Sequence, residues 1–359
     1  MNGMPSPASF LPEGALDTIR EYAASAEFHR DLAPETLELI YREGWFRLLV
    51  PRRWGGKAMA LPQLVRLEEG LAFADGSVGW VVTLCSGAGW FAGFLPEDLG
   101  DQVFTGQQLC IAGSGSITGE AHVVDGGYRV RGNWAYASGI RHATAYSANC
   151  VIWNGGMPSK DEEGKPVVRP FIFLPGEVRV HNDWNAMGLV ATGSHGFSVE
   201  GLTVAAERAF AIDPAAATDG DVLYRYPFRP LAEVTLAANI SGMGRHFLDC
   251  CSEYFKRREM PEALGLLTRA RAETAAARSD MYRILDSSWE LMKKELVPAE
   301  VFGGISRTTH VLAAKVREWV DQLYPYAGLG AARADSEINR VWRDLHTAGQ
   351  HPVLVFDHC

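Results

Sequence analysis

The sequence lacks any pair of cysteines at the spacing that binds zinc or forms a redox-active disulfide, because no C-x-x-C occurs in it. The cysteines are scattered along the chain, at Cys85, Cys110, Cys150, Cys250, Cys251 and Cys359. We therefore expect reduced thiols in a cytoplasmic protein, and no structural metal. The adjacent pair 250–251 is expected on the apolar side of a helix, where a free cysteine acts as a small core residue.

Clusters of basic residues and long apolar runs are missing as well. The 359 residues carry a formal net charge of −9, and no run of Lys and Arg is long enough to bind nucleic acid. No apolar stretch reaches the length that crosses a bilayer, and the N-terminus lacks the order of charged, apolar and small residues of a signal peptide. We expect neither nucleic acid nor a membrane as a partner.

The common nucleotide and hydrolase motifs are also absent: there is no Walker loop, no H-E-x-x-H and no G-x-S-x-G. Residues 113–119 and 328–330 contain glycines at spacings that partly match the dinucleotide fingerprint. That fingerprint needs a strand before it and a helix directly after it, so that the helix N-terminus meets the pyrophosphate. A hairpin is expected after the first stretch and the second lies between expected helices, which argues against a Rossmann site.

Hydrophobic periodicity divides the chain into three parts. A period near 3.6 predicts helices over residues 12–24, 33–43, 61–74 and 77–91, and the last of these is apolar nearly all round. From about 110 to 212 the period becomes 2, which predicts strands over 127–134, 145–153, 168–174, 178–180, 196–199 and 204–208. From about 227 onward, four long amphipathic segments with short connections predict a four-helix bundle.

The predicted fold is therefore an α+β multidomain chain. We expect an N-terminal helical domain over residues 1–109, a middle antiparallel β domain of sandwich or barrel type over 110–213, and a C-terminal four-helix bundle over 214–359.

The stretch 111–139 holds the features most typical of a binding site. Strands at 121–124 and 128–130 flank the sequence Asp-Gly-Gly, whose glycines supply the positive φ angles of a tight hairpin. A run of Gly, Ser and Thr precedes the hairpin and offers backbone N–H groups and hydroxyls, while aromatic and small residues alternate over 134–139. The combination suggests a bound planar cofactor, although an ordinary surface loop explains the Gly/Ser run equally well.

Five short motifs resemble those of the acyl-CoA dehydrogenase superfamily, in the family's order and across nearly the whole chain. They lie at residues 49–56 (LVPRRWGG), 132–139 (GNWAYASG), 183–194 (DWNAMGLVATGS), 228–230 (FRP) and 343–344 (RD). The resemblance implies the family's three-part fold, with a flavin between the β domain and the bundle. It also implies a homo-oligomer, a tetramer or dimer formed through the bundle. Aromatic residues there either meet a neighbouring subunit or form intrachain core: Trp319, Tyr324 and Tyr326.

The resemblance further implies the residues of a flavin site. Ser138 falls where family members place a hydroxyl near flavin N5, and Tyr136 falls at the aromatic residue that stacks on the ring. The other cofactor-binding positions that it implies are Gly113, Ser114, Ser116, Trp134, Thr192, Ser194 and Arg258.

Several departures from the family bear on the reaction. A dehydrogenase needs a carboxylate to take the substrate α-proton while hydride goes to flavin N5, and in common subfamilies a Glu lies about nine residues after the RD arginine. Counting from Arg343 reaches His351, and no carboxylate occurs from Leu345 until Asp357. The family's "TEP..GSD" element is replaced by 113–119, and no "tFG" follows Arg258, which in the family helps to hold the partner subunit's FAD pyrophosphate.

The two-component flavin monooxygenases of this fold, which take reduced FMN or FAD from a separate reductase, resemble the chain more closely at two places. These are residues 138–143 (SGIRHA) and the end of the last helix, where RD is followed by His346 and His351. A neutral histidine suits a base that activates a hydroxylated substrate. This resemblance implies Ser138 and His351 as catalytic residues. Many such enzymes also carry a histidine in the fourth helix, whereas this chain has none in 77–91.

The leading hypothesis is a reduced-flavin monooxygenase that hydroxylates a small aromatic or apolar substrate, with FAD or FMN as cofactor and a flavin reductase as partner. One alternative is an FAD-dependent acyl-CoA dehydrogenase whose base lies on another helix. The other is a non-catalytic family member that binds a ligand without turnover. The alternative for His346 and His351 is that they have no catalytic role and are ordinary surface or helix-end residues.

Overall fold

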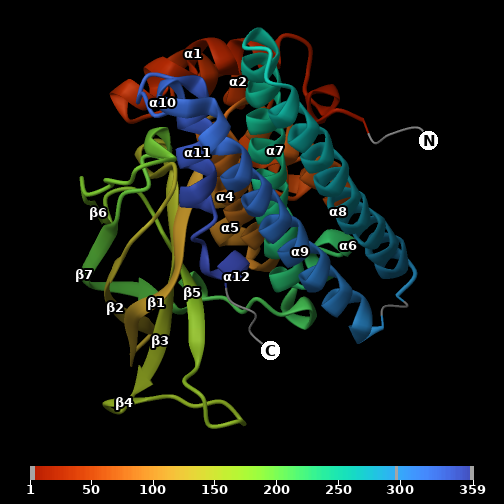
Figure 1. Cartoon of the computed structure of the whole chain (residues 1–359). Helices are drawn as coiled ribbons and strands as arrows, with labels where there is room; N and C mark the ends of the chain where they lie inside the picture. The colour runs from red at the N-terminus through yellow and green to blue at the C-terminus, as the bar shows by residue number, and fades with distance from the viewer. Residues whose placement is uncertain (1–4, 296–297, 356–359) are drawn as a thin grey trace.

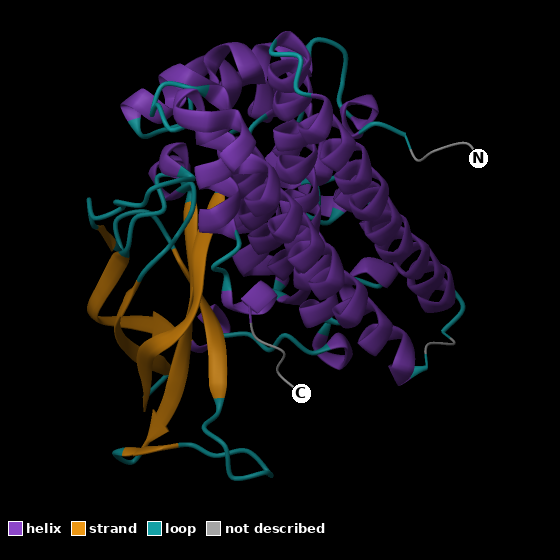
Figure 2. Cartoon of the chain, viewed as in Figure 1, coloured by secondary structure: helices purple, strands orange, loops and turns teal. Residues whose placement is uncertain are grey.

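The computed structural model describes residues 5–295 and 298–355, so Asp357, His358 and Cys359 lie outside the described residues. The helices form one large body, and the strands form a sheet that lies against one end of it (Figures 1 and 2). Along the chain the elements run helical, then strands, then helical again. This order confirms the predicted fold class.

The first helices follow the predicted segments closely. Their bounds are α1 Ala15–His29, α2 Pro34–Arg42, α3 Leu61–Ala74, α4 Gly76–Gly89 and α5 Glu97–Phe104. Asp75 caps α4, because its carboxylate accepts a hydrogen bond from the Val78 N–H at 3.0 Å. The segment Gly76–Phe94 is long and apolar enough to span a membrane by length and composition, contrary to the expectation above, but 83% of it is buried inside the protein. Burial on this scale is that of a core helix.

The strands form one seven-stranded sheet. They are β1 Ile111–Val124, β2 Gly127–Trp134, β3 Ala145–Asn154, β4 Met157–Pro158, β5 Val168–Phe173, β6 Arg179–Val180 and β7 Phe197–Ala205. The order is β4-β3-β1-β2-β7-β6, and β5 also pairs with β3. The pairing of β1 with β3 is parallel and the other pairings are antiparallel. The sheet is therefore mixed, because the chain crosses over after β2 and returns in the direction of β1. The expectation that the β domain is antiparallel is wrong for this one pairing.

Two strand predictions need correction. The Gly/Ser run expected as a loop is the first half of β1, and its pairing with β3 shifts register between Ser114 and Ile117 and again before Gly119. The predicted strands 196–199 and 204–208 are one strand, β7, interrupted by a bulge where the register shifts opposite β2. Gly201 has φ +68° at that bulge, a backbone conformation that residues other than glycine rarely adopt.

The C-terminal part contains the predicted bundle, formed by α7, α8, α9 and α11. All its helices have the bounds α6 Val222–Arg225, α7 Phe228–Arg257, α8 Pro261–Lys293, α9 Ala299–Leu323, α10 Gly328–Ala331, α11 Glu337–Ala348 and α12 Pro352–Val355. Helices α7 and α9 approach closely at Gly244, where an added Cβ would lie 2.3 Å from Val316 Cγ1.

The hydrophobic core joins the first and last parts of the chain. One continuous cluster contains Val81 of α4, Ile240 of α7 and Val316 of α9, while a second cluster fills the sheet around Trp134 and Phe197. The bundle aromatics have intrachain contacts. Trp319 is buried and donates to Glu273, Tyr324 stacks on Trp342 at 4.8 Å, and the Tyr326 ring meets that of Phe255 at 6.4 Å.

Candidate active site

Two segments meet edge to edge near one end of the sheet: residues 136–139, after β2, and residues 192–195, before β7. The Ala137 N–H donates to the His195 carbonyl at 3.1 Å, and the Gly139 N–H donates to the Thr192 carbonyl at 2.8 Å. Gly139 has φ +72°, and a Cβ there would lie 2.8 Å from Cys85 Sγ of α4. The backbone on both sides of Ser138 is therefore fixed.

Three buried hydroxyls form a row at this junction. Ser138 Oγ lies 2.8 Å from Ser194 Oγ, which lies 2.6 Å from Thr192 Oγ1. Thr192 Oγ1 in turn donates to the Leu189 carbonyl at 2.7 Å. The three side chains are 3%, 4% and 1% exposed, so water competes little for these hydrogen bonds.

Tyr136 lies at the outer side of the same junction. It is 69% exposed, and its backbone adopts φ +65°, which is unusual for a bulky residue. The edge of its ring meets the ring of Trp184 at 6.2 Å and 80°. A strained backbone that presents an open aromatic face is a feature that clusters at ligand sites.

The loop before Thr192 is seated on α11. Leu189 has φ +51°, its N–H donates to Asp344 Oδ1 at 2.5 Å, and its carbonyl accepts from Trp184 Nε1 at 3.1 Å. Arg343 donates to the Met187 carbonyl at 2.6 Å. Two of the sequence motifs, 183–194 and 343–344, therefore contact each other directly and join the sheet region to the last bundle helix.

His351 lies between α11 and α12, with its ring 5.8 Å from that of Trp80 on α4. Burial lowers the pKa of His351 to about 4, so the ring is neutral at pH 7. Its Nδ1 accepts a hydrogen bond from the Val353 N–H at 3.3 Å, which places the ring proton on Nε2. In this tautomer His351 offers a hydrogen-bond donor, and it can act as a base only after losing the Val353 contact.

Helix α4 contacts both candidate catalytic residues. Cys85 Sγ donates to the Ser138 carbonyl at 3.5 Å, and Trp80 meets His351. Cys85 lies five positions after Trp80, which is about 7.5 Å along the helix axis and about 140° around it. Ser138 and His351 thus both contact α4, on different sides of that helix.

Comparison with known proteins agrees with this architecture. Residues 234–356 match the family described as acyl-CoA dehydrogenase, C-terminal domain. The oxygenase subunit HsaA of a flavin-dependent monooxygenase from Rhodococcus jostii is 27% identical over 94% of this chain and 92% of its own length. The indole-3-acetate monooxygenase of Acinetobacter baumannii is 27% identical over 94% of this chain and 88% of its length.

These matches agree with the resemblance to the acyl-CoA dehydrogenase superfamily that the sequence motifs carry. Solved structures share its fold. The HsaA monooxygenase from Mycobacterium tuberculosis superposes with a TM-score of 0.89 at 24% identity, covering 97% of this chain and 94% of that one. XiaF from Streptomyces, in complex with FADH2 and glycerol, gives a TM-score of 0.85 at 21% identity, covering 94% and 89%.

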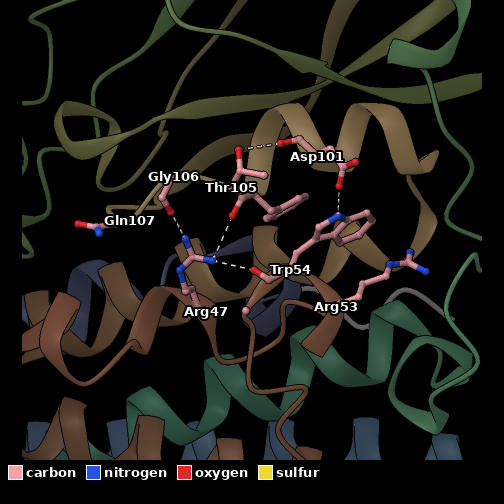
Figure 3. A pocket seen from close by; sticks show the side chains of 9 residues that line it. Arg47, Arg53, Trp54, Asp101, Thr105, Gly106 and Gln107 are labelled. Carbon is pink, nitrogen blue, oxygen red and sulfur yellow. Dashed lines mark hydrogen bonds between the residues drawn. The ribbon is translucent and has the colours of Figure 1, made fainter.

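Not every superfamily motif of this chain lies at the junction. The motif at 49–56 forms a turn in which the Gly56 N–H donates to the Pro51 carbonyl at 3.1 Å, and a Cβ on Gly56 would lie 1.9 Å from the Val50 carbonyl oxygen. This motif is therefore structural. Beside it lies an open surface pocket of about 510 Å³, lined by residues of 47–55 and 101–107 (Figure 3). There Trp54 Nε1 donates to Asp101 at 2.8 Å.

Several positions implied by the family resemblance lie apart from Ser138. Trp134 is fully buried in the sheet core, where it stacks on Phe197, so its ring has no face free for a cofactor. Gly113, Ser114 and Ser116 lie along β1. Arg258 lies at the C-terminal end of α7, with its guanidinium 4.7 Å from the Tyr254 ring. Thr192 and Ser194 do join Ser138.

Two residues that were not predicted from the sequence, His195 and Asp31, support the junction. His195 Nδ1 accepts from the Trp184 N–H at 2.9 Å, and burial, followed by the nearby Arg141 charge, lowers the pKa of His195. Asp31 accepts from His142 at 3.0 Å and so holds the segment after Ser138 to the loop after α1. The only sequence signal was proximity: His195 follows Ser194, and His142 lies in the motif 138–143.

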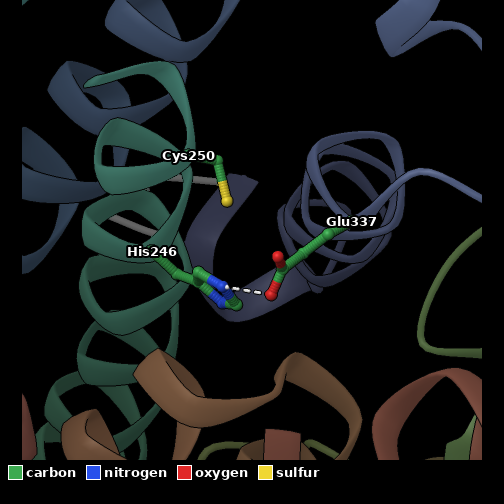
Figure 4. Close-up of side chains that lie close together, drawn as sticks. All are labelled: His246, Cys250 and Glu337. Carbon is green, nitrogen blue, oxygen red and sulfur yellow. Dashed lines mark hydrogen bonds and ion pairs between the residues drawn. The ribbon is translucent and has the colours of Figure 1, made fainter. Parts of the chain in front are cut away.

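Among the residues that the structure describes, one group places three possible metal-ligand atoms within 4.8 Å of one another: His246, Cys250 and Glu337 (Figure 4). His246 Nε2 lies 3.0 Å from Glu337 Oε1, and this hydrogen bond lowers the pKa of Glu337 to about 2. Burial raises the pKa of Cys250 to about 12, which keeps the thiol protonated. We interpret the group as a hydrogen-bonded pair, His246 and Glu337, that fastens α11 to α7.

Proposed function

We propose that this protein is the oxygenase component of a two-component flavin-dependent monooxygenase, which hydroxylates a small aromatic substrate with reduced FAD or FMN delivered by a separate reductase. The observation that carries the proposal is the junction itself. A fixed buried hydroxyl, Ser138, lies beside the exposed ring of Tyr136, and neutral His351 lies against the same helix as Ser138.

The residues present fit a flavin. The open face of Tyr136 suits a planar ring, and the Ser138 hydroxyl suits the ring nitrogen N5. Reduced flavin, when bound, would supply the electrons that activate dioxygen. In this proposal Tyr136 stacks on the ring and Ser138 orients it by a hydrogen bond. The buried surroundings of Ser138 exclude water.

His351 is proposed to position the substrate. Its Nε2–H can donate a hydrogen bond to a phenolic or similar oxygen, and its neutral state avoids a buried charge beside an apolar ring. Relatives named for indole-3-acetate and resorcinol support an aromatic substrate class. A histidine at this place also fits oxygenation better than α-proton removal, which calls for a carboxylate.

We further propose that the chain assembles as a dimer or tetramer through its bundle. Exposed Arg258, with its guanidinium 4.7 Å from the Tyr254 ring, would then lie at a neighbouring subunit's cofactor, as the family resemblance implies. Sedimentation velocity tests this, and a monomer at micromolar concentration would contradict it.

The function is tested by anaerobic titration with photoreduced FMN and FAD, followed by oxygenated buffer and a panel of phenols and indoles. We expect tight binding of the reduced flavin and a hydroxylated product from at least one substrate. Ser138→Ala and His351→Ala should each lower the product formed per reduced flavin and raise hydrogen peroxide. Copurification of oxidised FAD together with ferricenium-coupled oxidation of acyl-CoAs would establish the dehydrogenase alternative instead. Uptake of neither flavin would indicate a non-catalytic protein.

A further inference from the structure

The direction of each hydrogen bond in the hydroxyl row can be worked out from the number of protons available. A hydroxyl has one proton to donate, whereas a carbonyl only accepts. At 2.7 Å from the Leu189 carbonyl, Thr192 Oγ1 must donate to it, because two acceptors at that distance repel. Thr192 then has no proton left for Ser194, so at 2.6 Å Ser194 donates to Thr192.

The hydrogen bond between Ser138 and Ser194 has a fixed direction as well. Ser194 has used its proton on Thr192, so at 2.8 Å the Ser138 hydroxyl donates to Ser194. Ser138 Oγ is left with lone pairs only, and toward any further group it is an acceptor. The end of the row is firmly placed, because Asp344 of α11 accepts from the Leu189 N–H at 2.5 Å, and Trp184 Nε1, in the same loop as Leu189, donates to the Leu189 carbonyl at 3.1 Å.

We infer that Thr192 and Ser194 are selectivity-determining residues, which make the site prefer reduced over oxidised flavin by fixing Ser138 as a hydrogen-bond acceptor. The inference rests on the proposed function, in which Ser138 lies at flavin N5. Reduced flavin carries a hydrogen at N5 and donates there, whereas oxidised flavin has a lone pair at N5 and accepts.

The row of hydroxyls therefore fits the reduced flavin better than the oxidised flavin. Toward N5–H, Ser138 offers a lone pair and every hydroxyl keeps its partner. Toward oxidised N5, Ser138 must either present a lone pair to a lone pair or turn its proton away from Ser194. Turning the proton breaks the Ser138–Ser194 hydrogen bond or reverses the row and leaves Thr192 without its bond to Leu189. In this proposal Thr192 and Ser194 act on the redox preference through Ser138.

The test measures the dissociation constant of oxidised flavin, in air, and that of reduced flavin, under anaerobic conditions, both by fluorescence quenching. The ratio of the first constant to the second is the preference for reduced flavin. Thr192→Val keeps the side-chain shape but removes the acceptor for Ser194, so the Ser194 proton becomes available to Ser138. We expect the ratio to fall roughly three- to tenfold, the worth of about one hydrogen bond. Thr192→Ser restores the hydroxyl and should restore the ratio. Thr144→Val, a similar change elsewhere in the sheet region, should leave it unchanged.

A double-mutant cycle separates this effect from a general loss of packing. In a Ser138→Ala background, Thr192→Val should have no further effect on the ratio, because the residue that transmits it is gone. Should Thr192→Val not fold, as judged by circular dichroism, Ser194→Ala frees the Ser138 proton in its place and should lower the ratio likewise. Failure of the parent protein to bind either flavin overturns the proposed function. Flavin binding with an unchanged ratio in both variants overturns only this inference.

Discussion

The carboxyl oxygen Oδ1 of Asp344 accepts a hydrogen bond from the backbone N–H of Leu189 at 2.5 Å, which ties the last bundle helix to the loop that carries Thr192 and Ser194. Asp344 is 2% exposed, and Leu189 adopts φ +51°. The contact thus holds a strained backbone at a buried place. It gives the RD motif of the last helix a physical role in placing the site.

Replacing Asp344 with Ala should destabilise the protein. The change leaves the buried Leu189 N–H without an acceptor, at a cost of about 1–3 kcal/mol in the free energy of unfolding. Burial, followed by the nearby Asp75, raises the pKa of Asp344 to about 8, so its carboxyl group is mostly protonated at pH 7. Asp344→Asn is likewise uncharged and keeps an acceptor oxygen for the Leu189 N–H. Urea unfolding at pH 7 should therefore rank Asn well above Ala, and equal losses for both variants would contradict the assigned contact.

Replacing Gly188 with Ala should unseat the same loop. An added Cβ would lie 2.1 Å from the Arg343 carbonyl oxygen, and neither backbone can give way without moving the loop off α11. We expect a loss of about 1–3 kcal/mol, as for overpacking in a core. Gly115→Ala is the matched control, because nothing lies within 4 Å of an added Cβ there. Similar thermal denaturation midpoints for the two variants would show that the loop is not seated as described.

Stability should depend on the ionisation of Glu68. Burial raises the pKa of Glu68 to about 8, and its Oε2 has no hydrogen-bond partner among the described residues. Between about pH 4.5 and pH 8, Glu68 is protonated in the folded state and ionised in the unfolded state. Each rise in pH within this range therefore favours the unfolded state and lowers the free energy of unfolding. The free energy of unfolding should fall by up to about 1.4 kcal/mol per pH unit in this window.

Glu68→Gln supplies the check on that pH dependence. A glutamine cannot ionise, and its carbonyl oxygen can still accept the hydrogen bond that Ser86 Oγ donates to Glu68 Oε1 at 3.2 Å. Urea titrations between pH 5 and pH 8 should show a shallower decline for this variant than for the parent. A slope that Glu68→Gln leaves unchanged would assign the pH dependence to other buried groups.

His351 should matter as a neutral donor. Because its pKa is about 4, product formation should show no ionisation of His351 between pH 5.5 and pH 9. Loss of a positioned proton-transfer or hydrogen-bonding group in His351→Ala should lower hydroxylation about 100-fold. His351→Asn keeps an amide donor and should retain more activity than Ala. Equal loss in both variants would instead favour a base role for the ring, which an amide cannot fill.

The sequence determined the elements whose residues repeat at one clear period. Helix α3 has the predicted bounds 61–74 and β2 has the predicted bounds 127–134, because their apolar spacing and their flanking Pro, Asp and Gly residues act locally. The order of short motifs also sufficed for the fold class. Local patterns of this kind need no knowledge of distant partners.

Only the tertiary structure decided the rest. The Gly/Ser run became part of β1 because β3 pairs with it in parallel, and strand formation in weakly β-prone residues depends on such neighbours. Trp134 was implied at the cofactor, but the pleat turns its side chain into the sheet core. Above all, Ser138 lies 56 residues before Ser194 in the sequence, and the hydrogen bonds among the hydroxyls of Ser138, Ser194 and Thr192 depend on distances below 3 Å that only the folded chain creates.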